Sequence, residues 1–112
     1  MAPRTVLICD DDEASRSLLR RRLERQGIAC DVADSANEFR RALCDSTAVV
    51  LMDIELGDDD GRELVAKMKA DPYRWTVAAV ALTGYVTDDM ITSIQISGFD
   101  AYQSKPVLGA IV

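Results

Sequence analysis

The chain has no histidine among its 112 residues, so one of the two side chains that usually bind structural zinc is missing. Its three cysteines, Cys9, Cys30 and Cys44, are odd in number and show no CxxC spacing, which argues against a structural zinc site. We expect Cys9 and Cys30 to lie in strands as small buried hydrophobic residues. With no framework of disulfides or zinc, the sequence is typical of a protein in a reducing cytoplasm.

Long apolar runs and clustered positive charge are also scarce. No apolar stretch approaches the roughly 20 residues of a membrane-spanning helix, so we expect no membrane insertion. Asp10–Asp12 interrupt the first apolar stretch too early for a signal peptide. The formal net charge of −6 argues against direct nucleic-acid binding. The densest basic group, Arg20–Arg22 with Arg16 and Arg25, lies beside a leucine stripe and predicts a solvated helix face.

Apolar strand patterns alternate with amphipathic helix patterns along the chain. The expected strands are Thr5–Cys9, Ile28–Ala33, Ala48–Met52, Val77–Leu82 and Phe99–Tyr102, and the expected helices are Glu13–Gln26, Ala36–Cys44, Gly61–Ala70 and a segment from about residue 88 to Ser97. This alternation predicts an α/β fold with a doubly wound parallel sheet and helices on both faces. Residues 1–112 have the size of a single domain, and the acidic stretch Glu55–Asp60 is expected to be a loop.

The last residues do not complete the alternating pattern. A fifth helix is expected after Pro106, but residues 107–112 would form less than two helical turns. We therefore expect the fifth helix to be truncated or absent. Because this tail is apolar, we expect it to pack on a partner or a following domain, and a homodimer formed through it is a further hypothesis.

Polar side chains follow four of the five expected strands, three of them directly. Asp10 and Asp11 follow the first, Asp53 the third and Thr83 the fourth, and Lys105 comes shortly after the fifth. The carboxyl ends of parallel strands meet at one edge of the sheet, where open α/β sheets bind ligands. Three carboxylates, a hydroxyl and an ammonium group at this edge predict a site for a divalent cation and a phosphoryl group.

The chemistry of these groups suggests a division of labour. Asp11 and Asp53 can bind Mg²⁺ directly and Asp10 directly or through water, while a backbone carbonyl near Glu55 completes the set of oxygen ligands. Lys105 can form an ion pair with Asp53 or with a phosphoryl oxygen. Asp53 is then the expected nucleophile, as in other proteins that form an aspartyl phosphate.

Each of these residues also has a simpler interpretation. Asp10 and Asp11 could form a solvated turn before a helix, for which Asp12 is the best N-cap. Thr83 alone would be an ordinary turn residue and Lys105 an ordinary surface lysine. The functional interpretation is favoured because all these groups converge at one edge. Tyr102 fits a plain core position as well as a functional one.

In order and spacing, several segments resemble the receiver domain of two-component response regulators. They are Val6–Asp12, Leu51–Leu56 with Asp60-Gly61, Ala81–Gly84, Gly98–Tyr102 and Ser104–Pro106. The resemblance extends from Arg4 to Pro106 and implies a flavodoxin-like sheet with strand order 2-1-3-4-5. The segments around Thr83 and Lys105 look most like receivers attached to hybrid sensor kinases.

The resemblance implies a role for each residue of the acidic site. Asp10, Asp11 and Asp53 would hold Mg²⁺ with the backbone carbonyl of Glu55. Asp53 would accept a phosphoryl group from a histidine kinase or a histidine phosphotransfer protein. Lys105 would pair with that group, and the peptide bond between Lys105 and Pro106 would be cis.

The resemblance also implies a conformational switch. Thr83 would move toward the phosphoryl group and Tyr102 would turn inward, which would change the surface around the last helices and strand and control an attached or downstream output domain. Such a domain assists its own phosphorylation and dephosphorylation without being a free-standing enzyme. Glu55 and Tyr85 would tune the phosphate lifetime. Gly57 stands where the family commonly has proline, so residues 57–60 are expected to be more mobile.

Two other functions remain open from the sequence. A module that has lost phosphotransfer could only dock partners. A Mg²⁺-dependent phosphatase of the haloacid-dehalogenase type is less favoured, because that family needs an aspartate two residues after its nucleophile and this chain has Glu55 there.

Overall fold

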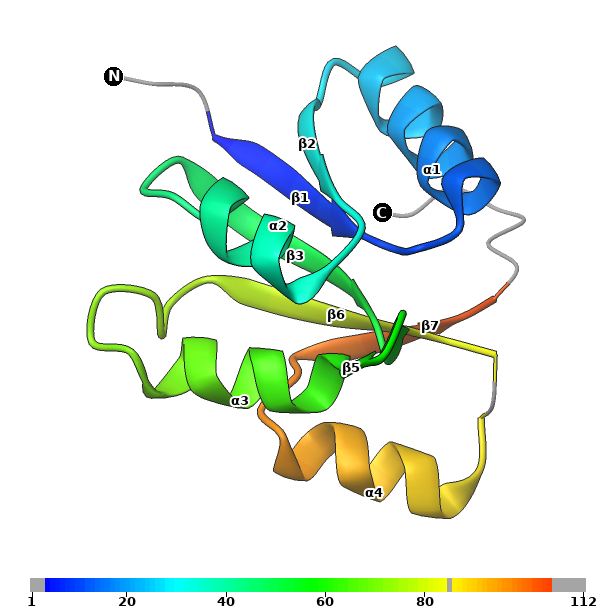
Figure 1. The fold of residues 1–112 in the computed structure, drawn as a ribbon, viewed down its shortest axis with the longest axis vertical. Helices are drawn as coiled ribbons and strands as arrows, with labels where there is room; N and C mark the ends of the chain where they lie inside the picture. The colour runs from blue at the N-terminus through cyan, green and yellow to red at the C-terminus, as the bar shows by residue number, and fades with distance from the viewer. Residues whose placement is uncertain (1–3, 85, 106–112) are drawn as a thin grey trace.

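The computed structural model describes residues 4–84 and 86–105, which form a five-stranded parallel sheet with helices on both faces (Figure 1). The sheet strands are β1 (Thr5–Cys9), β2 (Ala29–Ala33), β3 (Thr47–Asp53), β6 (Ala78–Thr83) and β7 (Ala101–Ser104). The helices are α1 (Glu13–Arg25), α2 (Ala36–Ala42), α3 (Gly61–Ala70) and α4 (Asp88–Ile96). The strand order β2-β1-β3-β6-β7 confirms the expected 2-1-3-4-5 arrangement, counted over the strands of this sheet.

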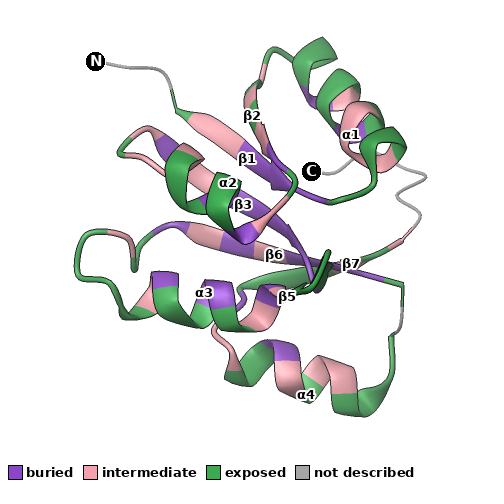
Figure 2. Ribbon diagram, viewed as in Figure 1, coloured by how far each residue is buried: buried purple, intermediate pink, exposed green. Residues whose placement is uncertain are grey.

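The two faces of the sheet carry separate hydrophobic cores. Leu7 and Cys9 belong to the core beneath α2, α3 and α4, whereas Ile8 belongs to the core beneath α1. This division follows from the alternation of side chains along a strand, and both faces of the central strands are covered (Figure 2). Cys9 is fully buried as expected, and burial raises the pKa of its thiol. Cys30 is only half-buried, which corrects the expectation, because β2 lies at the edge of the sheet.

Side-chain caps determine where each helix begins. Asp12, Ser35, Asp60 and Thr87 each accept a hydrogen bond from a backbone N–H of the first helical turn, at 2.9 to 3.2 Å. These bonds satisfy N–H groups that have no partner within the helix. Along the chain, Asp12 follows Asp10 by two positions and Asp60 follows Asp53 by seven. The caps therefore also fix the ends of the loops that leave the carboxyl edge of the sheet.

The acidic stretch predicted to be a loop contains a small hairpin. Strands β4 (Glu55–Leu56) and β5 (Asp59–Asp60) pair antiparallel and enclose a two-residue turn. Gly57 has a φ of +62°, and no residue other than glycine has a positive φ in the described ranges. This sign pattern matches a type II′ turn, which favours glycine at its first central position. The loop prediction was therefore wrong for this stretch.

The expected boundaries of two other elements are wrong by two residues, and those of β2, β3, β6, α1 and α4 are wrong by one residue at one or both ends. The last strand begins at Ala101 and not at Phe99, because Phe99 packs into the core after α4. Strand β7 ends at Ser104, two residues beyond the expected end, and leads directly to Lys105. Helix α2 ends at Ala42, two residues before the expected end.

Some expectations concern residues outside the described ranges. These are the role of Tyr85, the cis bond before Pro106, the truncated fifth helix and the packing of the apolar tail. Among the described residues, no helix has the length and apolar character needed to span a membrane.

Candidate functional site

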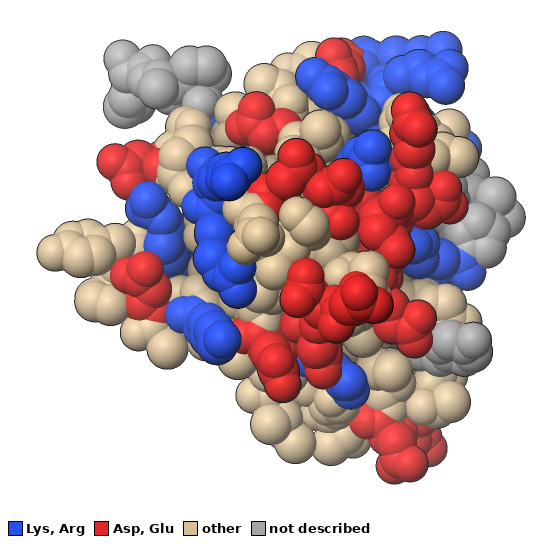
Figure 3. Space-filling model, in the orientation of Figure 1, with Lys and Arg blue, Asp and Glu red and all other residues tan. Residues whose placement is uncertain are grey.

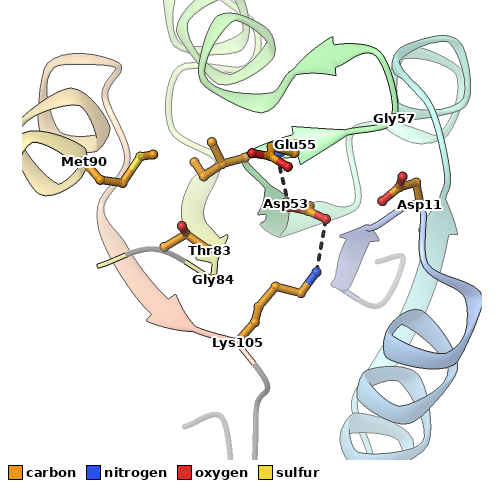
Figure 4. Close-up of a pocket in the computed structure, with 9 residues that line it drawn as sticks. Asp11, Asp53, Glu55, Gly57, Thr83, Gly84, Met90 and Lys105 are labelled. Atoms are coloured by element: carbon orange, nitrogen blue, oxygen red, sulfur yellow. Dashed lines mark hydrogen bonds and ion pairs between the residues drawn. The ribbon is translucent and has the colours of Figure 1, made fainter. Parts of the chain in front are cut away.

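The carboxyl edge of the sheet brings most of the predicted side chains together around one cavity (Figure 4), whereas Asp10 contacts Lys105 and does not line that cavity. Asp53 ends β3 and Thr83 ends β6, while Asp10 and Lys105 immediately follow β1 and β7. The cavity has a volume of about 290 Å³. It is lined by Asp11, Asp53, Ile54, Glu55, Gly57, Thr83, Gly84, Met90 and Lys105. The structure therefore brings the predicted acidic, hydroxyl and ammonium groups close together, and their roles stay predictions.

Lys105 lies between two buried carboxylates. Its Nζ is 2.9 Å from Oδ2 of Asp10 and donates a hydrogen bond of 3.1 Å to Oδ2 of Asp53. The exposed fraction is 0% for Asp10 and 7% for Asp53, so both acids are largely removed from water. Such contacts between ions are stronger in a buried setting than in water. The ammonium group is the counter-charge that allows both acids to be buried here.

The environment changes the acidity of Asp53. Burial raises its pKa to about 6, although the hydrogen bond and charge of Lys105 and the bond from the backbone N–H of Glu55 lower it. For Lys105, burial lowers the pKa, but contacts with Asp10 and Asp53 and their charges raise it further, so the net shift is upward. Lys105 therefore remains charged at neutral pH, whereas Asp53 loses its proton only near pH 6.

The acidic residues fit a divalent cation. Asp10, Asp11 and Asp53 each offer a carboxylate oxygen, and these three oxygens lie within 4.8 Å of one another. Oδ2 of Asp10 is buried, and among the described residues its close partner is the ammonium of Lys105 at 2.9 Å. A hard cation, which prefers oxygen ligands, would bind these carboxylates and reduce the repulsion among them. The site thus has the donor set for Mg²⁺.

The turn after β1 is held by bonds that the sequence analysis did not anticipate. Asp10 Oδ1 accepts a hydrogen bond of 3.0 Å from the backbone N–H of Asp12. Arg16 reaches back from α1, and its Nη1 donates a bond of 2.9 Å to the carbonyl oxygen of Asp10. The pattern predicted Arg16 as part of a solvated face, and its distance of six residues from Asp10 gave no sign of this contact. Asp11 stays exposed at the edge of the site.

Gly61 allows α3 to approach the strand that carries Asp53. A Cβ atom at this position would collide with the carbonyl oxygen of Asp53 and lie 2.8 Å from Cγ of Met52. The backbone N–H of Gly61 donates a bond of 2.8 Å to the carbonyl oxygen of Ile54. The Asp60-Gly61 pair was part of the predicted pattern, but the steric reason for the glycine depends on the packing.

The structure places two further residues differently from the simplest expectation. Met90 was not among the predicted site residues, yet its side chain extends from α4 toward the cavity (Figure 4). Its place in the expected helix from about residue 88 was the available signal, and the sequence analysis did not use it. Tyr102 does not line this cavity and is 44% exposed on β7, so the plain core interpretation is wrong. Its inward movement stays a prediction.

The comparison with known families agrees with this arrangement. The family model of the response regulator receiver domain matches residues 6–110. The chain belongs to this family. The five-stranded sheet and the acidic cluster at its carboxyl edge are therefore those of a receiver domain, the type of domain found in two-component signalling.

Individual relatives of this receiver domain differ in how much of their length it covers. It is 33% identical to an uncharacterized 14.6 kDa protein of Leptolyngbya boryana, over 96% of this chain and 82% of that protein. It is also 33% identical to the transcriptional regulatory protein PmrA of Pectobacterium parmentieri, over 90% of this chain and 45% of PmrA. The chain thus spans about half of that longer regulator.

A solved structure of similar fold carries the expected modification. It is a response regulator protein from Burkholderia pseudomallei with a phosphorylated aspartic acid, a calcium ion and citrate. It is 28% identical to this receiver domain, with a TM-score of 0.81, and the match covers 92% of this chain and 60% of that one.

Proposed function

We propose that this receiver domain accepts a phosphoryl group on Asp53 from the phosphohistidine of a histidine kinase or a histidine phosphotransfer protein, with Mg²⁺ as cofactor. The observation that carries the proposal is the position of Asp53, which lines the cavity together with the ammonium of Lys105 and a second acid, Asp11. The phosphorylated aspartic acid of the related Burkholderia protein supports it.

The transfer exchanges one bond to phosphorus for another. A carboxylate oxygen of Asp53 attacks the phosphorus, the P–N bond to the donor imidazole breaks, and its electron pair returns to the imidazole nitrogen. Lys105 and the hydroxyl of Thr83 then stabilise the negative charge on the phosphoryl oxygens. A Mg²⁺ ion held by Asp10, Asp11, Asp53 and the backbone carbonyl of Glu55 would supply further charge neutralisation when bound. Positioning and charge compensation are what phosphoryl transfer requires.

Phosphorylation would then shift the domain between two conformations. Thr83 ends β6 and is 3% exposed, and α4 is the next element along the chain. A movement of the Thr83 hydroxyl would therefore shift the segment that connects β6 to α4. Tyr102 would move inward from its exposed position on β7. These changes would bias the α4–β7 surface toward a kinase partner or an output domain, as a population shift. Hydrolysis of the aspartyl phosphate would reset it.

The test is intact-mass analysis after incubation with Mg²⁺ and a small acyl phosphate donor. We expect a gain of one phosphoryl group in the parent, none in Asp53→Asn, and none without metal. Asp58→Asn is the matched control, because Asp58 is an exposed acid of the hairpin turn. Absence of phosphorylation under all conditions would contradict the proposal and favour a domain that only docks partners. Turnover of a general phosphatase substrate would instead favour the hydrolase.

A further inference from the structure

Two neighbouring cavities at the carboxyl edge share part of their lining. The first is the Asp53 cavity, and the second, of about 270 Å³, lies against the β4–β5 hairpin and the start of α3. Ile54, Glu55, Gly57 and Met90 line both of them. Met90 is the residue that α4 contributes to each cavity, so the position of α4 determines where this side chain lies between or beside them.

Arg62 joins the hairpin to α4. Its Nε and Nη2 each donate a bond of 2.9 Å to Asp60, one to each carboxylate oxygen. Its remaining terminal nitrogen, Nη1, donates a bond of 3.0 Å to Oγ of Ser93. The planar guanidinium holds both partners in a fixed geometry. Ser93 follows Met90 by three residues, so both lie on the same side of α4.

The other end of this connection is fixed to the strand that carries Asp53. Asp60 pairs with Glu55 in the hairpin, and Gly61 packs directly against the backbone of Asp53. Arg62 therefore lies next to a segment that packs directly against Asp53. Figure 3 shows acidic side chains gathered over the hairpin region, so the second cavity lies beside a strongly polar surface.

We propose that Arg62 is a positioning residue that holds α4 through Ser93, so that Met90 closes the hairpin side of the Asp53 cavity against water. This proposal rests on the proposed phosphorylation of Asp53. The reaction that this closure limits is hydrolysis of the aspartyl phosphate. A water oxygen attacks the phosphorus and the P–O bond to Asp53 breaks. Its electron pair returns to the carboxylate, and the proton of the water leaves with inorganic phosphate or to solvent. An apolar side chain at the entrance lowers the rate by excluding water.

The size of the effect follows from one hydrogen bond. A bond of ordinary net strength changes the ratio of closed to open α4 by about threefold to tenfold. If hydrolysis proceeds from the open form, losing the Arg62–Ser93 bond should shorten the half-life of the aspartyl phosphate by about the same factor.

The experiment follows the decay of the phosphorylated mass after the donor is removed, at fixed Mg²⁺ concentration. We expect Ser93→Ala and Arg62→Ala each to shorten the half-life about threefold to tenfold, and the double variant to shorten it no further. Ser93→Thr keeps the hydroxyl and should retain the parent half-life. Thr92→Ala, at an exposed position of the same helix, and Arg74→Ala, whose ion pair with Asp45 lies away from the site, are the matched controls.

The outcomes separate this inference from the function on which it rests. A parent that gains no phosphoryl group would contradict the proposed function itself. A phosphorylated parent with unchanged half-lives in Ser93→Ala and Arg62→Ala would overturn the inference, as would additive effects in the double variant. Thermal unfolding of each variant identifies any loss of folding in Arg62→Ala, in which case Ser93→Ala and Met90→Ala decide. A Met90→Ala half-life equal to that of the parent would also overturn it.

Discussion

Lys105 and Asp53, which are 52 positions apart in the chain, meet with 3.1 Å between Nζ and Oδ2. The same ammonium group lies 2.9 Å from Asp10 Oδ2, so one cation serves two buried acids, with Asp11 close by. The local charge therefore stays negative without a metal. This imbalance explains why the site suits a divalent cation, and it predicts different effects for substitutions of its individual residues.

Replacing Lys105 with methionine should destabilise the fold and abolish phosphorylation. The substitution leaves Asp10 and Asp53 buried without their counter-charge, which we expect to lower the free energy of unfolding by about 2 kcal/mol. Urea denaturation at pH 7.5 measures it. Lys67→Met is the control, because Lys67 is exposed on α3, and an equal loss in both variants would refute the explanation.

Replacing Asp53 with asparagine should have a pH-dependent effect on stability without metal. Because burial raises the pKa of Asp53 to about 6, the folded state retains a proton that the unfolded state loses near pH 4. The contribution of this carboxyl to stability is complete below pH 4 and is lost as the pH rises through 6. Asparagine cannot ionise, so Asp53→Asn should gain about 1–2 kcal/mol relative to the parent above pH 6. Urea denaturation with a chelator at pH 4 and pH 7.5 measures the difference, and a pH-independent difference would contradict it.

Asp11→Asn should weaken Mg²⁺ binding without affecting the fold. Asp11 is exposed at the edge of the site, so we expect its free energy of unfolding to change by less than about 0.5 kcal/mol. Loss of one carboxylate ligand should reduce Mg²⁺ affinity by at least about tenfold, as measured by isothermal titration calorimetry. Asp12→Asn is the adjacent control, because asparagine preserves the N-cap of α1 and this residue lies outside the acidic cluster. Equal affinities for Asp11→Asn and the parent would exclude Asp11 as a ligand.

Gly61→Ala should be among the most damaging small substitutions in the domain. The new Cβ would meet the backbone of Asp53, so we expect a loss of about 3 kcal/mol in the free energy of unfolding and reduced phosphorylation. Gly84→Ala should change stability by less than about 0.5 kcal/mol, because nothing lies within 4 Å of its added Cβ. Parallel urea denaturation of the two variants tests this contrast, and similar losses in both would show that steric contact is not the cause.

Much of the fold could be predicted because its signals are local. The apolar strand β3 and the amphipathic helix α3 each contain their periodicity within a short segment, and caps such as Asp12 stand next to the helices that they begin. The weaker predictions concern segments in which packing decides. Phe99 has strand character, yet it packs into the core after α4, and Gly57 turns an acidic stretch into a hairpin.

The sequence by itself determined which chemical groups follow which strands, and the parallel sheet then places Asp10, Asp53, Thr83 and Lys105 at one edge. That result depends on strand and helix patterns, which neighbouring residues encode. Only the tertiary structure decided that Lys105 contacts two acids and that Arg62 reaches Ser93, 31 positions away. These contacts depend on how helices and loops pack across the sheet, and their geometry is fixed by steric fit and burial between distant segments.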